Sequence, residues 1–258
     1  MALILPVGPA LSIKFSIRWS IQSFEETRGK PMGKSRYLYV ALGDSITAGY
    51  SAPDKRGFAT QLAGWLAGVY PSFSYINAGK KGLTSSQLAG YLTISPALRH
   101  AIRQSSLMTL DIGGNDLLYA YIKYFFLGNP AIYPHTIRLY AINLHRIYSQ
   151  LTALSLSPLY TLNLYNPFPH SKSSSTWVPL LNRETEEVSR IWGVPVVNIY
   201  ERFLGREKQL IHGYRTGRLS DIRIGSGGYP VHPNLAGHQV ITEALLETIP
   251  IQKDSHTG

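Results

Sequence analysis

The chain lacks cysteine and long apolar runs, and it is poor in acidic residues. Without cysteine, its 258 residues can form no disulfide, thiolate metal site or cysteine nucleophile. No apolar stretch approaches the roughly 20 residues that a membrane-spanning helix needs. Lys and Arg number 25 against 15 Asp and Glu, so the net charge is +10. Because the basic residues are scattered, we expect modest adhesion to acidic surfaces such as a membrane, and no dedicated nucleic-acid site.

What is present is typical of a globular protein with one large core. Hydrophobic residues make up 44% of the chain and charged residues 16%, proportions that exclude a disordered protein. We expect one domain over residues 32–250, followed by a short tail at 251–258.

Residues 1–31 differ from the rest. Their opening apolar stretch is interrupted by Pro6, Gly8 and Pro9, with no basic residue before it and no clear small-residue cleavage site after it. It is therefore a poor secretory signal, and we expect a cytoplasmic protein. The segment is predicted to be an extension, either translated from upstream or added by cloning. The alternative is an extra strand or helix that packs on the domain.

Short apolar runs alternate with helical patterns along the rest of the chain. This alternation predicts a parallel sheet covered by helices on both faces. The predicted strands are residues 37–42, 73–76, 107–112, 159–164 and 194–199. Helices are predicted at residues 58–69, from a cap at Thr84 or Ser85 onward, at 96–104, through Val188 and Ile191, and from 234 through 245. A long helical region is also predicted after residue 116, with breaks near 128–130 and at Pro134.

Ser45 follows the first predicted strand, in the run Gly43-Asp44-Ser45. The carboxyl ends of parallel strands meet at one rim of the sheet, where open α/β proteins bind their ligands. A serine hydroxyl is a poor nucleophile until a base removes its proton, so a catalytic Ser45 needs a partner. Asp44 is interpreted as a residue that shapes the turn.

His232 is the predicted base. It stands in the constrained run Tyr229-Pro230-Val231-His232-Pro233, just before the last predicted helix. Histidine is the side chain best suited to take a serine proton near neutral pH. Gly225, Gly227 and Gly228 precede it and give the loop conformational freedom.

Three hydrogen-bond donors are candidates for an oxyanion hole. Gly79 and Asn115 each follow a predicted strand, so they should lie near Ser45 at the same rim. Backbone N–H groups of Ser45 and Gly79 and the amide of Asn115 would stabilise the negative charge of a tetrahedral intermediate.

The blocks around these residues resemble the GDSL or SGNH hydrolase family. The blocks are, in family order, Gly43-Asp44-Ser45, Asn77-Ala78-Gly79-Lys80-Lys81-Gly82, Gly113-Gly114-Asn115-Asp116 and His232-Pro233-Asn234 with Gly237-His238. Four blocks in order are specific where one tripeptide would not be. The resemblance implies a three-layer α/β/α, flavodoxin-like fold, Ser45 as nucleophile, His232 as base, and an oxyanion hole from Ser45, Gly79 and Asn115. It also implies hydrolysis of carboxylic esters without a metal or other cofactor.

One position departs from the family pattern. The family usually has an aspartate three residues before this histidine, and here Tyr229 stands there. That aspartate holds the imidazole tautomer and stabilises the imidazolium. Three alternatives remain open: a dyad in which a backbone carbonyl orients His232, replacement by Asp221, or an impaired catalyst. We favour a dyad or a weakened enzyme over replacement by Asp221.

The function predicted is therefore a serine esterase or lipase, with lysophospholipids or esters of short to medium acyl chains as plausible substrates. The alternatives are a carbohydrate O-deacetylase and a binding protein without activity. Acyl-chain length, headgroup and oligomeric state do not follow from the sequence.

Other conspicuous residues are interpreted structurally. Asp116 is expected to be a charge at a helix N-terminus, and His238 to lie on a helix surface. Cores usually take up clusters such as Tyr119, Tyr121, Tyr124, Phe125 and Phe126, although this one could also form the floor of an acyl pocket. Residues 165–169 are a candidate pocket wall. The remaining histidines lack partners at ligand spacing, so no metal site is predicted.

Overall fold

A computed structural model describes residues 36–223 and 229–250. The predicted extension at 1–31, the tail at 251–258, and the loop glycines 225, 227 and 228 lie outside the described residues.

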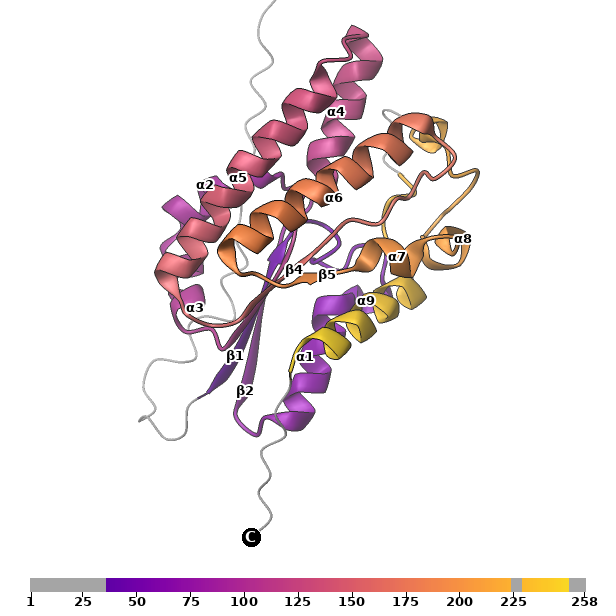
Figure 1. The fold of residues 1–258 in the computed structure, drawn as a ribbon. Coiled ribbons are helices and arrows are strands. Elements are labelled where there is room, and N and C mark those ends of the chain that lie inside the picture. The colour runs from indigo at the N-terminus through magenta and orange to yellow at the C-terminus, as the bar shows by residue number, and fades with distance from the viewer. Residues whose placement is uncertain (1–35, 224–228, 251–258) are drawn as a thin grey trace, which may run out of the picture. The chain divides into compact units, whose positions relative to one another are not determined.

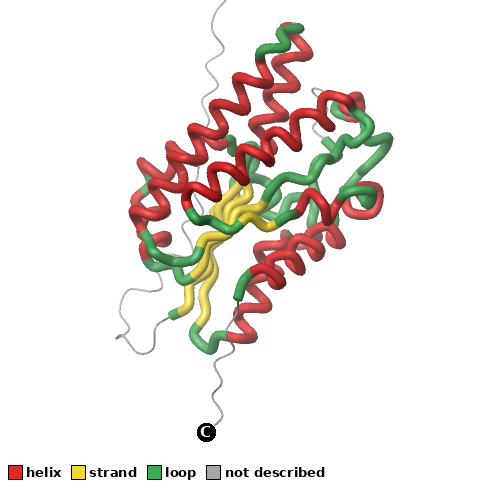
Figure 2. Tube along the Cα trace, viewed as in Figure 1, coloured by secondary structure: helices red, strands yellow, loops and turns green. Residues whose placement is uncertain are grey.

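Five parallel strands form the central sheet in the order β2-β1-β3-β4-β5. Helices cover both of its faces (Figures 1 and 2). The predicted three-layer α/β/α architecture is confirmed, and the strand order is the flavodoxin-like one. The strands are β1 (Tyr37–Gly43), β2 (Phe73–Gly79), β3 (Leu107–Asp111), β4 (Leu159–Leu162) and β5 (Val196–Val197).

The period-two alternation of β1 separates two cores. Val40 and Leu42 point into the core beneath one helical layer, whereas Tyr39 and Ala41 point into the other. The first layer contains α2 (Ser85–Ile94), α3 (Pro96–Arg103), α4 (Gly114–Leu127), α5 (Ile132–Leu154) and α6 (Lys172–Trp192). The second contains α1 (Phe58–Val69), α7 (Ile199–Phe203), α8 (Glu207–Leu210) and α9 (Leu235–Thr248), and it includes the packing of α1 against α9.

Side-chain caps explain where several helices begin. Thr84 caps α2 with a capping box. Its hydroxyl accepts from the N–H of Gln87, and the Gln87 side chain accepts from the N–H of Thr84. Asn234 caps α9 by accepting from the N–H of Gly237 at 3.0 Å.

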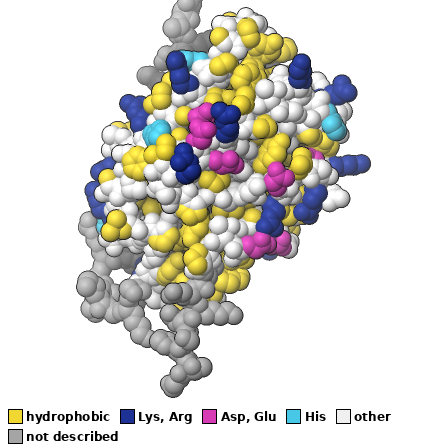
Figure 3. Space-filling view, viewed as in Figure 1, with side chains coloured by type: hydrophobic (Ala, Val, Ile, Leu, Met, Phe, Trp, Pro, Cys, Tyr) yellow, Lys and Arg dark blue, Asp and Glu magenta, His cyan; other side chains and the backbone are white. Residues whose placement is uncertain are grey.

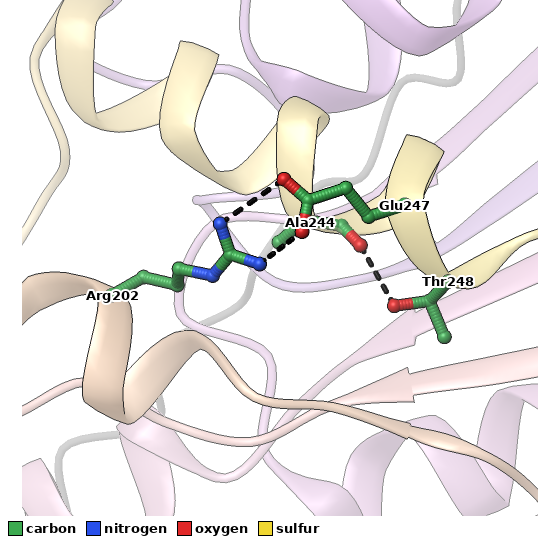
Figure 4. A network of polar contacts seen from close by, with 4 residues as sticks. All are labelled: Arg202, Ala244, Glu247 and Thr248. Carbon is green, nitrogen blue, oxygen red and sulfur yellow. Dashed lines mark hydrogen bonds and ion pairs between the residues drawn. The ribbon is translucent and has the colours of Figure 1, made fainter.

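Arg202 of α7 pairs with Glu247 near the end of α9, where Thr248 also donates to the carbonyl of Ala244 at 2.8 Å (Figure 4).

Several predicted boundaries were wrong. Strand β2 continues to Gly79, because its partner β1 offers ladder bonds along the whole length. Strand β5 has two residues instead of six, since Asn198 caps α7 by accepting from the N–H of Glu201. Pro134 does not break a helix: it lies in the first turn of α5, where no intrahelical N–H bond is lost.

Two short 3-10 turns, η2 (Pro53–Lys55) and η3 (Leu219–Asp221), complete the elements of the described chain. Within residues 36–223 and 229–250, no helix is both long and apolar enough to cross a membrane.

Candidate active site

Ser45 lies on a sharp turn at the carboxyl end of β1. Gly43 has a φ of 154°, and a Cβ there would come within 2.3 Å of the carbonyl oxygen of Asp111. Only glycine fits this position without strain. The Asp44 carboxylate accepts from the N–H of Ile46 at 2.9 Å, so Asp44 shapes the turn as expected. The turn thereby presents Ser45 at the rim of the sheet.

His232 reaches Ser45 from a chain segment 187 residues away. Its Nε2 lies 2.9 Å from the Ser45 Oγ, within hydrogen-bond distance. Backbone contacts hold the loop: the carbonyl of His232 accepts from the N–H of His212 at 2.9 Å, and that of Val231 accepts from the Tyr165 hydroxyl. The structure therefore brings together the predicted nucleophile and the predicted base.

Among the described residues, no acceptor is found for Nδ1, the other ring nitrogen of His232. Tyr229 borders the same cavity as His232, but its hydroxyl makes no hydrogen bond to the imidazole. Asp221 is engaged elsewhere, since its carboxylate accepts from Thr216 and from the N–H of Gly217. Replacement of the usual aspartate by Asp221 finds no support in these contacts.

The surroundings of His232 disfavour its charged form. Burial lowers the pKa of His232 to about 4, with smaller electrostatic contributions from Lys81 and His212. The imidazole is therefore neutral at pH 7, the form that can accept a proton. Lys81 is exposed at the cavity edge, and its Nζ lies 5.1 Å from the centre of the Tyr50 ring.

The three predicted oxyanion donors differ in the hydrogen bonds that they already make. The Ser45 N–H has no acceptor within the described part of the chain. The Gly79 N–H donates to the Asn77 side chain at 2.9 Å. The Asn115 amide donates to Asp44 at 2.9 Å and to the carbonyl of Leu83 at 3.0 Å. Gly79 and Asn115 can therefore serve an oxyanion only by sharing or exchanging these hydrogens.

Gly79 also has a packing role that its sequence block did not reveal. A Cβ at this position would lie 2.4 Å from the N of Ala48 and 2.8 Å from the carbonyl carbon of Thr47. The end of β2 thus lies directly against the turn that carries Ser45.

Buried carboxyl groups lie beneath Ser45. Burial raises the pKa of Asp44 to about 7, and the negative charge of Asp116 adds to the effect. The pKa of Asp111 is raised well above its usual value by burial and by Asp44. Its Oδ2 is buried and has no partner among the described residues. Asp116 accepts from the backbone and the hydroxyl of Ser85, which ties α4 to the start of α2.

A largely apolar cavity of about 370 Å³ extends from the Ser45–His232 pair. The expected wall is confirmed for Tyr165, Pro167 and Phe168 of the 165–169 loop. Another part of the wall does not follow from the sequence: Tyr133 of α5 stacks on Trp177 of α6 at 5.0 Å between ring centres, and both line the cavity. Helical spacing alone marks such residues as core, so no local signal could assign them to a cavity.

The interpretation of His238 was wrong, and that of the aromatic cluster of α4 holds only in part. His238 is fully buried and does not lie on the helix surface, because its Nδ1 accepts from the N–H of Phe58 at 3.1 Å. The aromatic cluster of α4 does not belong to the core as a whole. Tyr119 and Tyr121 border the cavity, whereas Phe125 and Phe126 are exposed.

No group of three or more histidine, aspartate or glutamate side chains that could hold a metal ion is found in residues 36–223 and 229–250.

Comparison with known proteins gives one family match and several relatives. The model of the GDSL-like lipase/acylhydrolase family matches residues 41–240. The spore germination lipase LipC of Bacillus licheniformis is 26% identical over 214 residues, which cover 80% of this chain and 93% of that protein.

Solved structures share the fold. The lipase Lip_vut3 from a goat rumen metagenome has a TM-score of 0.69 at 23% identity, with 82% of this chain and 96% of that chain covered. A catalytic mutant of an acetylxylan esterase from Geobacillus stearothermophilus has a TM-score of 0.62 at 18% identity, with 84% and 96% covered.

Proposed function

The chain belongs to the GDSL-like lipase/acylhydrolase family and is a carboxylic ester hydrolase, and from this premise we propose that it cleaves acyl esters through an acyl-enzyme on Ser45. His232 removes the hydroxyl proton as Ser45 attacks the ester carbonyl carbon, and it then gives that proton to the departing alcohol. Water, activated by the same imidazole, releases the carboxylic acid. The observation that supports this most is the 2.9 Å separation of Ser45 Oγ and His232 Nε2 at the wall of an apolar cavity.

The three hydrogen-bond donors at the rim of the sheet stabilise the negative charge of the tetrahedral intermediate in this proposal. The Ser45 N–H can point at the oxyanion directly. Asn115 and Gly79 join it by turning hydrogens away from Asp44 and Asn77, their present acceptors. Each such donor typically contributes a few kcal/mol to the stability of the transition state.

The pair works as a dyad in this proposal. No carboxylate faces Nδ1 of His232 in the described chain, and Lys81 opposes a positive charge on the ring. The imidazolium that forms during acylation therefore lacks the partner that a triad supplies, and we infer a slower enzyme than one with the usual aspartate.

The substrate class inferred is a lipid-like ester with an apolar acyl chain, such as a lysophospholipid. The cavity wall is mainly leucine, isoleucine and aromatic side chains, which suit an acyl chain. A carbohydrate O-deacetylase is less favoured, because a sugar would find few partners for its hydroxyls along this largely apolar wall. No metal or organic cofactor takes part in the proposed reaction. A cytoplasmic location for the protein stays a prediction.

Turnover of p-nitrophenyl acyl esters of increasing chain length tests the proposal. Ser45→Ala and His232→Ala should each abolish turnover, and Asn115→Ala should reduce kcat by about 10²- to 10³-fold. Ser173→Ala is the matched control, since this serine borders the same cavity and should keep near-normal activity. Turnover that survives in Ser45→Ala would refute the proposal, and acetylated sugars hydrolysed faster than acyl esters would favour the deacetylase.

A further inference from the structure

The C-terminal turn of α4 exposes three consecutive large apolar side chains. Phe125, Phe126 and Leu127 are 62%, 67% and 70% exposed, and together they form what we call the apolar tip. The chain turns at Gly128 and re-enters as α5 at Ile132. The tip thus stands at the free end of the α4–α5 pair, at the top of Figure 1. Exposed apolar surface of this kind marks an interaction site.

The surroundings of the tip carry positive charge. Between Asp54 and Glu184 the only acidic residues are Asp111 and Asp116. Asp111 is buried, and the Asp116 carboxylate accepts hydrogen bonds from the N–H and the hydroxyl of Ser85. Lys123 and Arg138, by contrast, are exposed on the two helices that end and begin at the tip. In Figure 3, Lys and Arg side chains flank the hydrophobic surface at the top of the view.

No acidic side chain neutralises these two cations within the described residues. The ion pairs of the described residues join Arg56 to Asp54, Arg183 to Glu187 and Arg202 to Glu247, and none of these residues lies on α4 or α5. An apolar patch with an uncompensated basic flank complements a surface that offers anionic groups above hydrocarbon.

The tip and the cavity share one helix. Tyr119, Tyr121 and Ile122 of α4 border the cavity. At a rise of about 1.5 Å per residue, the tip begins only about 5 Å further along the helix axis than Ile122. A lipid that meets the tip therefore lies close to the apolar wall that would receive an acyl chain.

We propose that the apolar tip, flanked by Lys123 and Arg138, docks this protein onto an anionic phospholipid bilayer. Phe125, Phe126 and Leu127 enter the boundary between headgroups and acyl chains, and the two cations contact lipid phosphates. A second copy of the chain is a poorer occupant, because it would bring the same positive charge to the tip. The docking is independent of the chemistry at Ser45.

Vesicle co-sedimentation of the full chain tests this, with phosphatidylcholine vesicles that contain or lack phosphatidylglycerol. The unaltered protein should bind the anionic vesicles at least about tenfold more tightly, and high salt should weaken that binding. The double variant F125S/F126S should bind about tenfold or more weakly. The double variant K123A/R138A should lose the preference for anionic vesicles.

Three controls separate docking from other effects. Ile191→Ser alters a side chain of α6 that is similarly exposed, at 63%, and should bind as the unaltered protein does. Ser45→Ala should also bind normally, so a failure of the proposed catalysis leaves the docking result interpretable. F125S/F126S should hydrolyse a soluble short-chain ester at the normal rate.

Two results would overturn the proposal. One is equal vesicle binding by F125S/F126S and the unaltered protein, or binding that ignores lipid charge. The other is light scattering that finds a dimer which F125S/F126S converts to a monomer, without vesicle binding, because the tip would then join two copies of the chain.

Discussion

At the scale of single residues, the unusual feature is that the surroundings of His232, the proposed base, disfavour its charged form. Burial, Lys81 and His212 all lower the pKa of His232, to about 4 from the usual 6.5. A base acts when it is unprotonated, so the reactive form of His232 is already dominant in mildly acidic solution.

The first prediction concerns the pH profile of the unaltered protein. If the neutral imidazole is the base, kcat/KM should rise with pH through a midpoint near 4. Initial rates with a soluble ester, with circular dichroism to confirm folding at each pH, provide the measurement. A midpoint at 6.5 or above contradicts the environment described for His232.

The second prediction concerns Tyr229. Tyr229→Asp restores a carboxylate at the family's usual spacing, where it can stabilise the imidazolium. The expected result is at least about a tenfold rise in kcat/KM, below the 10⁴-fold that such an aspartate is worth in a serine protease. The midpoint of the pH profile should also move upward, because a nearby negative charge raises the pKa of histidine.

Tyr229→Phe is the matched control. It removes only the hydroxyl, which has no role in the dyad, so rate and pH profile should stay as they are. A large loss of activity in Tyr229→Phe would mean that the tyrosine hydroxyl itself orients His232, and the dyad account would then be wrong.

At the scale of elements, close contacts at the ends of β1, β2, α1 and α9 place the site. Gly79 ends β2 against the turn that carries Ser45, and His238 of α9 holds the first N–H of α1. Both residues belong to the conspicuous sequence blocks, yet their contacts join segments distant in the chain.

Gly79→Ala tests the first of these contacts. The new Cβ meets backbone atoms of Thr47 and Ala48, which cannot move aside cheaply. We expect a loss of about 1–3 kcal/mol in the free energy of unfolding, measured with urea. A displacement of Ser45 should also lower kcat by about 10²-fold.

Gly90→Ala in α2 provides the matched control. A Cβ at Gly90 meets no atom within 4 Å, so the substitution should preserve activity and raise stability by at most about 1 kcal/mol. Equal effects of the two alanines would show that Gly79 has no close backbone approach.

His238 makes stability depend on pH. Burial lowers its pKa to about 4 in the folded chain, against about 6.5 when unfolded. Its contribution is therefore complete above pH 6.5 and is lost as the pH falls towards 4. Urea unfolding at pH 7 and pH 5 should differ by about 1–2 kcal/mol more in the unaltered protein than in H238N.

Asparagine is chosen because its side-chain oxygen can still accept from the N–H of Phe58 but does not titrate. The other buried ionisable groups, including His232 and Asp44, are common to both proteins, so their effects cancel in the comparison. An identical pH dependence in the two proteins would assign the acid sensitivity to another group.

At the scale of the whole molecule, the sheet and the Ser45–His232 pair followed from the sequence, and the cavity did not. Strand-helix alternation and the strand-end positions of Ser45, Gly79 and Asn115 depend on local patterns and on the rule that parallel strands end at one rim. The hydrogen-bond acceptors of Asn115 and Gly79 depend on side-chain rotamers, which sequence patterns do not determine. The exposure of Phe125 and Phe126 depends on how the neighbouring helices pack around the end of α4, since an aromatic run in a helix is equally compatible with a core.

Identification of the residue that a fluorophosphonate probe modifies tests the central claim most directly. Peptide mass mapping of the unaltered protein should find the adduct on Ser45, and His232→Ala should slow labelling by at least about 10²-fold because the hydroxyl then lacks its base. An adduct on another residue, or labelling of Ser45 at the same rate without His232, would contradict the claim.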